Sequence, residues 1–554
     1  MAEHTPSETE HTPVLIVGGS LVGLTTSLLL ARYGVANTVV EKHRGTAIHP
    51  RAASFHQRTM EVFRHAGVQE IVEEAAAGEF VQNGAIVAVE SLCGAELQYF
   101  YRSWNEGVED LSITPRLFIT QVGLEPLLRD AAQEQGATHL FGTEVIGLQQ
   151  DGSGVTTRIR DRDSGEERVI RSQYVVAADG AHSAIRADLG IDMPGHGSAD
   201  CVTIYFGADM TEMIGDRNLS VIYVLHPELL GFFRFSFDRQ SGFLSIFSVT
   251  DPITGGKADL GADVTEDQAV AWVRMALGCD ADTPVRIDSI QHWEASAGCA
   301  SAFSRGRVFL AGDSAHTMPP TGGWGGNTGV ADAHNLAWKL AAVVNGHAGP
   351  GLLDSYDQER RPAALMTVEQ AYAIYAGRYA ERSTQDTRAL AAPRPAEDIE
   401  LGAVYRSTAL SGSAALYGDG DEADTRDPRA PRVPVGARIP HVPVTVGGVA
   451  LSTHDLFTGT LSLLVGADGD GWAHAAQQLA DEGVPLSAYT IGEAAEVSAP
   501  DAAVRDALGL DAAGALLVRP DGVLAWRGVG GEDAARRLRE ALDEVLAAPS
   551  AAMA

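Results

Sequence analysis

Cysteine is scarce in this 554-residue chain: only Cys93, Cys201, Cys279 and Cys299 are present, and no two of them form a CxxC pair. We therefore expect no disulfide framework and no cysteine-based redox or zinc motif. HExxH and GxSxG motifs are also missing, which argues against a metalloprotease and against an α/β-hydrolase. The sequence predicts no metal site.

Basic residues are few as well. The chain has 41 Lys and Arg against 73 Asp and Glu, a formal net charge of −32, and an isoelectric point of about 4.8. Nucleic acid and anionic membrane surfaces are disfavoured as partners. The polar start MAEHTPSETEHTP is unlike a signal peptide, and no apolar run approaches the length of a membrane span. We expect a soluble cytoplasmic protein.

The first positive signal is a dinucleotide-binding pattern in residues 13–41: a short apolar strand, a glycine turn, an apolar helix and a second strand. Gly18 opens the turn, and Glu41 ends the second strand 23 positions later. In such a βαβ unit the acidic side chain accepts the ribose hydroxyls. The predicted dinucleotide contacts are Gly18, Ser20, Leu21 and Gly23 in the turn, with Glu41 and Lys42 at the strand end.

The turn departs from the GxGxxG pattern at one position, because Ser20 stands where the middle glycine is expected. That glycine lets the backbone approach the pyrophosphate. Serine adds a small side chain there, so the turn alone is a weaker signal. The strand before it, the helix after it and Glu41 make the combined pattern specific.

A second signal lies in the middle of the chain. Residues 308–311 form a short apolar strand that runs into Gly312 and Asp313. Two prolines and five glycines follow within residues 319–329, which predicts a loop without regular structure. Apolar residues at helical spacing then predict a helix from Val330. A helix that opens from a glycine loop directs N–H groups and a positive dipole end at its ligand, which suits a cofactor ring that becomes anionic.

The run GDSAHTMPPTGGWGGNTGVADAHNLAWKL, from Gly312 to Leu340, resembles the second flavin fingerprint of FAD-dependent aromatic hydroxylases. These are single-component flavoprotein monooxygenases of the p-hydroxybenzoate and phenol hydroxylase type. The resemblance covers nearly the whole chain and points to the polyketide branch, which includes aklavinone 11-hydroxylase and the tetracenomycin and angucycline oxygenases. It implies FAD as cofactor, NADPH as a reductant bound without its own Rossmann domain, and dioxygen as co-substrate.

The resemblance also implies cofactor contacts outside the first turn. Arg51 would lie beside the flavin ring or pyrophosphate, and Gln121 would contact the ribityl chain. Asp179, after an apolar strand, would organise both FAD and the transient nicotinamide site. A surface ion pair for Arg51 and a helix cap for Gln121 are the alternatives. From the second fingerprint the implied cofactor-binding residues are Asp313, Pro320, Gly325, Gly326 and Asn327.

Residues 191–285 alternate aromatic and polar side chains, which predicts a mostly antiparallel sheet. The resemblance places the substrate against this sheet, where Tyr223 would line a pocket for a flat aromatic molecule; a core position is the alternative. Tyr375 and Arg378 are three apart on a predicted helix and share one face. There the guanidinium of Arg378 would stabilise a phenolate, or would simply be solvated. Tyr223 and Arg378 are the catalytic candidates.

The C-terminal part has an αβ pattern that resembles the thioredoxin-like domain of phenol hydroxylase relatives. Residues 466–469 (GADG) stand where a redox CxxC would be, and no cysteine follows Cys299, so disulfide chemistry is excluded there. We expect this domain to serve packing or the shaping of an oligomer. The chain is predicted to be a monomer or homodimer.

The predicted fold class is α/β: a Rossmann-like FAD-binding domain with an inserted, mostly antiparallel substrate-binding sheet and a C-terminal thioredoxin-like domain. The predicted boundaries are 12–80, 112–190 and 286–395 for the FAD-binding domain, 81–111 and 191–285 for the substrate sheet, and 396–554 for the linker and C-terminal domain.

The function that the resemblance implies is NAD(P)H-consuming hydroxylation of a phenolic polycyclic aromatic polyketide in antibiotic biosynthesis, through a C4a-hydroperoxyflavin. Baeyer–Villiger or ring-rearranging oxygenation of a polycyclic polyketide, and oxidative inactivation of an aromatic antibiotic, remain alternatives. A flavin-binding module without turnover is a further alternative, from a different functional class, and substrate-stimulated NADPH oxidation separates it from the enzymes.

Overall fold

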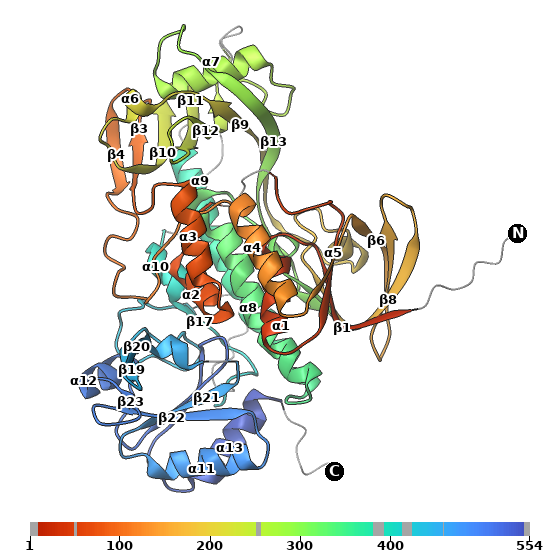
Figure 1. The fold of residues 1–554 in the computed structure, drawn as a ribbon, viewed down its shortest axis with the longest axis vertical. Helices are drawn as coiled ribbons and strands as arrows, with labels where there is room; N and C mark the ends of the chain where they lie inside the picture. The colour runs from red at the N-terminus through yellow and green to blue at the C-terminus, as the bar shows by residue number, and fades with distance from the viewer. Residues whose placement is uncertain are drawn as a thin grey trace, which may run out of the picture.

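The computed structural model describes residues 9–48, 53–250, 256–379, 393–412, 424–457 and 459–547. Three large sheets follow one another along the long axis of the molecule (Figure 1). The sheet that contains β9 (Gly195–Gly207), here called the outer sheet, lies at the top of this view. The sheet that contains β1 (Glu10–Val17), here called the central sheet, lies in the middle with the long helices, and the C-terminal sheet lies at the bottom.

The central sheet is built from short apolar strands in the order β14-β15-β8-β1-β2-β5, with β6 and β7 joined to β8. From β15 to β5 all neighbours run parallel, and their apolar runs are buried as expected for such a sheet. The strands are β2 (Asn37–Glu41), β5 (Thr138–Phe141), β6 (Thr143–Gln150), β7 (Val155–Asp161), β8 (Glu167–Ala177), β14 (Ser304–Arg305) and β15 (Val308–Leu310).

Helices pack around this sheet and form most of the first core. The strongest helix contacts join α1 to α8 and to α4. The helices are α1 (Leu21–Arg32), α2 (Gln57–Ala66), α3 (Gln69–Glu79), α4 (Gln121–Glu134), α5 (Ala184–Asp188), α8 (Trp324–Val344) and α9 (Asp354–Tyr379), with 3-10 turns η1 (Gly312–Ser314), η2 (Thr321–Gly323) and η3 (Pro350–Leu353).

The outer sheet has the order β16-β13-β9-β12-β11-β10-β3-β4, and its pairs are antiparallel apart from β10 with β3. Helix α7 packs on one face and buries Trp272 there. The elements are β3 (Ala85–Val89), β4 (Glu96–Tyr101), β9 (Gly195–Gly207), β10 (Leu219–His226), β11 (Leu229–Phe235), β12 (Ser241–Val249), β13 (Arg286–Cys299), β16 (His316–Thr317), α6 (Thr211–Ile214) and α7 (Glu266–Leu277).

The strand pairing bears on the predicted boundary at residue 286. Strand β13 begins at Arg286 and pairs with β9 along its length, so it belongs to the outer sheet. We therefore draw the boundary at Cys299, where β13 ends beside β16. Sequence patterning could not show this, because one strand extends from the outer sheet to the central domain.

The C-terminal domain has the sheet order β20-β19-β23-β22-β21-β24-β25. Strands β21 and β22 are parallel around α11, and β24 and β25 form an antiparallel hairpin before α13, so the predicted α/β pattern is confirmed. That the domain is thioredoxin-like stays a prediction. Its elements are β19 (Pro443–Val446), β20 (Val449–Ser452), β21 (Leu461–Gly466), β22 (Leu486–Gly492), β23 (Val497–Ser498), β24 (Ala515–Val518), β25 (Leu524–Gly528), α11 (Asp470–Asp481), α12 (Asp501–Ala503), α13 (Ala534–Val545), η7 (Thr453–Leu456) and η8 (Val504–Leu508).

The segment between the central and C-terminal sheets contains α10 (Ala396–Leu401) and the short pair β17 (Ala403–Val404) and β18 (Asp424–Thr425). Within the described parts of the chain, no helix has the length and apolar character needed to cross a membrane.

Candidate active site

Three loops meet at one edge of the central sheet. They follow β1, β8 and β15, which are adjacent and parallel, so their carboxyl ends lie side by side. Gly18 comes after β1, Asp179 after β8, and Gly312 after β15. In open parallel sheets this edge is where ligands bind.

The first glycine turn lies against the neighbouring strand end. Gly18 has φ +108°, and a Cβ there would lie 2.1 Å from the carbonyl oxygen of Ala178. A Cβ on Gly23 would lie 1.9 Å from the carbonyl oxygen of Gly18. Only glycine fits either position, and α1 therefore begins at Leu21 with its N-terminus directed at the sheet edge.

Ser20, the departure from the glycine pattern, is tied to a carboxylate that sequence reasoning missed. Its Oγ donates to Oε1 of Glu125 at 2.5 Å. The same oxygen accepts the N–H of Leu21 at 2.9 Å and Nε2 of Gln121 at 2.9 Å, and Oε2 accepts the N–H of Ala47 at 2.7 Å. The fully buried Glu125 thus joins the glycine turn, α4 and the segment after β2. Its only sequence signal was its position four residues after Gln121 on one helical face.

Glu41 stands at the end of β2, as predicted. Its Oε2 accepts the N–H of Gly19 at 2.7 Å, and its Oε1 accepts the N–H of His43 at 2.8 Å. The carboxylate is buried beside the turn, whereas the next residue, Lys42, is exposed. Glu41 is therefore held in the place where a ribose would meet the sheet edge.

The second fingerprint packs directly on the first, although nearly three hundred residues separate them. A Cβ on Gly312 would lie 2.8 Å from the side chain of Val22, and one on Gly329 would lie 2.5 Å from it. Gly312 has φ +65° and donates its N–H to Asp332 at 3.0 Å. Asp313 follows on the exposed side of this turn.

The prediction of an irregular loop over residues 319–329 is wrong in its second half. Helix α8 begins at Trp324 rather than at Val330, so Gly325 and Gly326 lie in its first turn, and Pro320 precedes the 3-10 turn η2. Glycine has low helix propensity, which is why the sequence predicted a loop. Close packing of Gly329 on Val22 and Gly312 outweighs that propensity, since any larger residue would separate the helix from the sheet.

Asn327 is fully engaged by the protein. Its Oδ1 accepts the N–H of His56 at 2.9 Å and Oγ1 of Thr59 at 2.7 Å. Its Nδ2 donates to the carbonyl oxygens of Ser54 and Gly323 at 2.9 and 2.7 Å. The side chain thus fixes the start of α8 against α2. Toward a cofactor, Asn327 offers the backbone N–H of a first helical turn.

The remaining predicted cofactor residues occupy the same edge or fall outside the described structure. Asp179 lies after β8, accepts the N–H of Ile185 at 3.4 Å, and has a buried Oδ1 without a hydrogen-bond partner among the described residues. Gln121 begins α4 next to Ser20, with a 3.3 Å contact to its Oγ. Arg51 lies outside the described residues, so its predicted contact is not placed.

These features fit FAD. The glycine turn provides a surface that a Cβ would block, two helix N-termini supply N–H donors and positive dipole ends for phosphate and ring oxygens, and Asp179 presents an unpartnered carboxylate oxygen. Glu41 supplies the acidic group that a ribose needs.

Six aromatic residues, here called the aromatic wall, form a continuous run of ring contacts between the outer sheet and α9. Tyr223 on β10 contacts Phe100 and Phe232, with ring centroids 5.5 and 5.9 Å away. Phe247 continues the wall, 5.9 Å from Phe232 and 6.0 Å from Tyr375 on α9. The sixth member is Trp293, 6.2 Å from Phe247. The structure thus brings Tyr223 and Tyr375 to one wall. Arg378 follows on α9, but its side chain lies outside the described structure, so its predicted contact is not placed.

A buried ionic cluster behind the second fingerprint was not predicted. Asp332 on α8 accepts Nε2 of His316 at 2.8 Å and Nε of Arg360 at 2.8 Å, in addition to the N–H of Gly312. Burial alone would raise the pKa of Asp332, but His316 and Arg360 outweigh it and hold that pKa below its usual value. A charged Asp332 therefore fixes the turn that carries Asp313.

Two further buried groups near the site were also missed. Arg234 on β11 donates to the carbonyl oxygen of Ala53 at 2.8 Å, and burial lowers its pKa to about 9, so it stays charged at neutral pH. Glu400 accepts two bonds from Arg116, at 3.1 and 3.0 Å, and lies 3.5 Å from His56. Burial raises the pKa of Glu400 to about 7. Arg234 lies in a predicted strand and Glu400 in the predicted linker, and neither pattern identified a buried charge.

Comparisons with known proteins agree with this geometry. A family model described as FAD binding domain matches residues 11–371, and one described as aromatic-ring hydroxylase, C-terminal, matches residues 433–549. The chain is 46% identical over 551 residues to a 4-methyl-5-nitrocatechol 5-monooxygenase of Burkholderia sp, covering 98% of each chain. It is 36% identical to a tetracenomycin A2 monooxygenase-dioxygenase of Streptomyces glaucescens, again covering 98% of each.

A crystal structure of aklavinone-11 hydroxylase with FAD and aklavinone superposes with a TM-score of 0.88 and 37% identity, covering 98% of this chain and 100% of that one. The fold and these comparisons thus define a flavoprotein that binds FAD. The chain belongs to the FAD-dependent aromatic-ring hydroxylase family and is an FAD-dependent aromatic monooxygenase.

Proposed function

We propose that this monooxygenase hydroxylates a phenolic, polycyclic aromatic polyketide in antibiotic biosynthesis, with NAD(P)H and dioxygen as co-substrates. The observation that carries the proposal is the extent of the aromatic wall, whose rings come from β4, β10, β11, β12, β13 and α9. A flat molecule of several fused rings matches a surface of this width. Relatives named as polyketide and aklavinone hydroxylases support the same substrate class.

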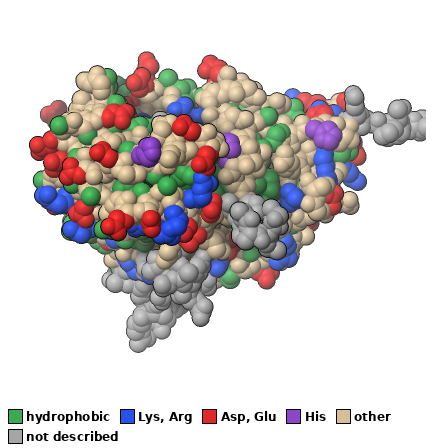
Figure 2. All heavy atoms as spheres, turned by 90° about the horizontal axis from the view of Figure 1, so that it is seen from below, with side chains coloured by type: hydrophobic (Ala, Val, Ile, Leu, Met, Phe, Trp, Pro, Cys, Tyr) green, Lys and Arg blue, Asp and Glu red, His purple; other side chains and the backbone are tan. Residues whose placement is uncertain are grey.

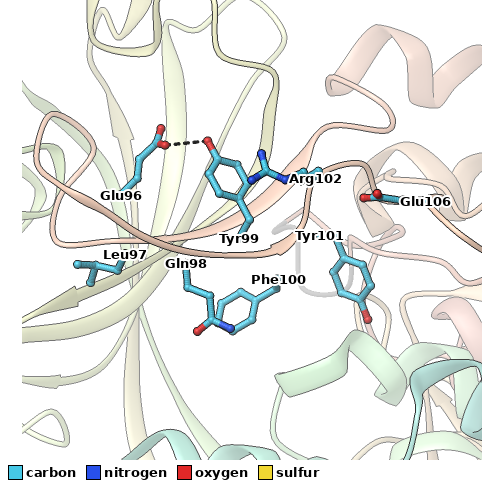
Figure 3. A pocket seen from close by; sticks show the side chains of 8 residues that line it. All are labelled: Glu96, Leu97, Gln98, Tyr99, Phe100, Tyr101, Arg102 and Glu106. Atoms are coloured by element: carbon cyan, nitrogen blue, oxygen red, sulfur yellow. Dashed lines mark hydrogen bonds between the residues drawn. The ribbon is translucent and has the colours of Figure 1, made fainter.

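The hollow beside β4 adds to this argument. It has a volume of about 630 Å³ and is lined by residues 96–102 and Glu106. Figure 3 shows Gln98 and Phe100 projecting from one side of the strand and Tyr99 from the other. Phe100 belongs both to this hollow and to the aromatic wall. In this proposal the outer rings of a polycyclic substrate lie in this hollow.

The protein's own groups have three tasks in this proposal. The first turn of α8 directs N–H donors and a positive dipole end at the bound ring, which favours negative charge there. The aromatic wall excludes water from the reacting centre. Tyr223 and Arg378 hold the substrate's phenolic oxygen and favour its anionic form, which makes the ring a better nucleophile. FAD, when bound and reduced by NAD(P)H, supplies the activation of dioxygen.

The test is NADPH consumption and product mass with a panel of phenolic polycyclic polyketides. We expect at least one of them to raise NADPH oxidation about tenfold or more and to gain one oxygen atom. Tyr223→Phe should lower kcat at least tenfold, whereas Tyr489→Phe, on β22 of the C-terminal sheet, should leave it unchanged. A panel in which no polycyclic phenol stimulates oxidation would contradict the proposal. A lactone product would favour Baeyer–Villiger oxygenation.

A second candidate is hydroxylation of a single-ring nitrophenol or nitrocatechol. The 46% identity to the 4-methyl-5-nitrocatechol 5-monooxygenase, over nearly the full length of both chains, favours it. The same assay separates the two, because 4-methyl-5-nitrocatechol belongs in the panel. If it gives the higher kcat/KM, the single-ring function replaces the polyketide one.

A further inference from the structure

Helix α8 carries a ladder of buried polar residues: Thr328, Asp332, Asn335 and Lys339. Their spacing of four, three and four places them on one helical face. All are buried in a helix whose other buried positions are mainly apolar. Buried polar groups on one stripe require partners along that stripe. The partners come from two different parts of the molecule.

The N-terminal end of the ladder supports the FAD site. Arg360 on α9 donates from Nε to Asp332 at 2.8 Å and from Nη2 to the carbonyl oxygen of Thr328 at 3.3 Å. Asp332 in turn accepts the N–H of Gly312, which follows β15 and directly precedes Asp313. Arg360 therefore ties α9 to the first turns of α8, and Asp332 ties α8 to the turn at Gly312.

The C-terminal end of the ladder is held by the C-terminal domain. The turn Arg519-Pro520-Asp521-Gly522, between β24 and β25, is inserted between α8 and α9. Arg519 is fully buried and donates to both oxygens of Glu359, at 2.5 and 2.8 Å. Asp521 accepts Nδ2 of Asn335 at 3.2 Å. Lys339 completes the group with a 2.9 Å bond to Glu359.

Two consecutive residues of α9 connect these ends. Glu359 binds the C-terminal turn, and Arg360 binds the fingerprint support. Burial opposes ionisation of Glu359, but Arg519 and Lys339 outweigh it and hold its pKa well below the usual range. Without Arg519, an ionised Glu359 would lose its bidentate partner in a water-free interior, which is strongly unfavourable. When that turn of α9 shifts, the adjacent Arg360 would lose the positions from which it donates to Asp332 and Thr328.

The outward face of the C-terminal domain is different. Figure 2 shows acidic and basic side chains interspersed over the face seen from that end of the molecule. The pairs Arg536–Glu540 and Arg539–Glu482 of this domain have side chains that are 45–61% exposed. Exposed pairs of this kind contribute little to stability. The buried turn at Arg519 therefore has more energetic leverage on the rest of the chain than these exposed pairs.

We propose that the Arg519–Asp521 turn is a positioning device for the flavin: the C-terminal domain sets the register of α8 on α9, and through Arg360 and Asp332 it fixes the turn that holds FAD. The inference rests on FAD binding and is independent of which substrate is hydroxylated.

The test is FAD affinity of the full-length Arg519→Gln variant, measured by quenching of flavin fluorescence, alongside the melting temperature of the apoprotein. We expect the Kd for FAD to rise at least tenfold, with more peroxide released per NADPH oxidised. A purely structural role would lower the melting temperature and leave the Kd of the folded protein unchanged. That result would overturn the proposal.

A matched control is Asp455→Asn. Arg64 on α2 donates to Asp455 at 2.6 and 3.1 Å, so this pair also joins the C-terminal domain to the central one. Neither residue belongs to α8 or α9. The control variant should keep the Kd for FAD within twofold of the parent value. An equal loss of FAD affinity in both variants would show a general docking effect and contradict the specific role of Arg519.

A milder variant, Arg519→Lys, keeps the test decisive if Arg519→Gln does not fold. Lysine retains the charge but cannot make the bidentate contact with Glu359. We expect a two- to fivefold rise in the Kd for FAD in folded Arg519→Lys protein. An unchanged Kd together with a lowered melting temperature would overturn the proposal here too.

Discussion

Glu125 is a single residue on which the first glycine turn depends. Its carboxylate accepts four donors from three segments of the chain, and its two oxygens have different tasks. One oxygen accepts from Ser20, Leu21 and Gln121, and the other accepts the N–H of Ala47 among the residues that the structure describes. This arrangement explains how serine is accommodated where a glycine is usual, because the hydroxyl has a fixed partner to the side of the turn.

Replacing Glu125 with Gln should destabilise the protein although the shape is conserved. An amide places an NH₂ group against one of the N–H donors, so one buried donor loses its acceptor. We expect the free energy of unfolding to fall by about 2 kcal/mol. The measurement is urea denaturation of the apoprotein. Glu134→Gln, at the exposed end of the same helix, is the control and should change nothing. Equal stability of the two variants would contradict this role of Glu125.

The position of a single residue could be predicted where the local sequence pattern determines it. It could not be predicted where the residue's role depends on partners elsewhere in the chain. Gly18, Glu41 and the Gly312–Asp313 pair could be placed from local pattern, since strand ends and glycine turns are local properties. Glu125 and Asp332 could not, because Ser20 lies 105 residues from Glu125 in the chain and Arg360, which pairs with Asp332, is on a different helix. A charged residue in an apolar helix signals a buried network but does not identify the other members.

At the scale of elements, the order of strands explains why two distant fingerprints form one site. The turn after β1 lies against the end of β8, and α8 lies against the turn after β15. The strands and their glycine turns were predicted correctly. The start of α8 was not, because glycines in its first turn carry a low intrinsic propensity that tertiary packing overrides. Close approach of a helix to a sheet has no local signature other than glycine itself.

This close approach predicts the effect of Gly18→Ala. The added Cβ would lie 2.1 Å from the carbonyl oxygen of Ala178, so β1 and β8 would have to separate at the FAD edge. We expect FAD binding to be lost in equilibrium dialysis. Gly34→Ala is the matched control: Gly34 also has positive φ (+74°), but no atom lies within 4 Å of its added Cβ. That variant should lose about 1 kcal/mol of stability and retain FAD. FAD binding by Gly18→Ala would refute the argument.

At the scale of the whole molecule, the C-terminal domain is joined to the central domain by buried charge rather than by an apolar surface alone. Arg438 donates to both oxygens of Glu61 on α2, in addition to the Arg519 turn on α8 and α9. The sequence predicted a third domain and assigned it packing or oligomer shaping. It could not show where the domain docks, because ion pairs between distant segments leave no pattern in either segment.

Buried histidines at this junction make its stability depend on pH. Burial lowers the pKa of His65 to about 4 and that of His454 to about 3. The unfolded chain titrates near pH 6.5, so below that pH each of these residues takes up a proton only on unfolding. Each therefore contributes nothing above pH 6.5 and costs about 1.4 kcal/mol per pH unit as the pH falls toward the folded value. Glu400 acts in the opposite direction between pH 7 and 4.5, since its pKa is raised to about 7 by burial.

Two histidines against one carboxyl leave a net loss of about 1.4 kcal/mol per pH unit between pH 6.5 and 4.5, and His56 and His334, whose pKa values burial also lowers, increase it. We expect the melting temperature to fall steadily from pH 6.5 to 5. His454→Gln should make this dependence shallower, because one proton uptake is removed. Glu400→Gln should make it steeper, because the opposing group is removed. Calorimetric scans at half-unit pH steps measure all three slopes, and parallel slopes in the parent and both variants would show that these buried groups do not govern the pH dependence of stability.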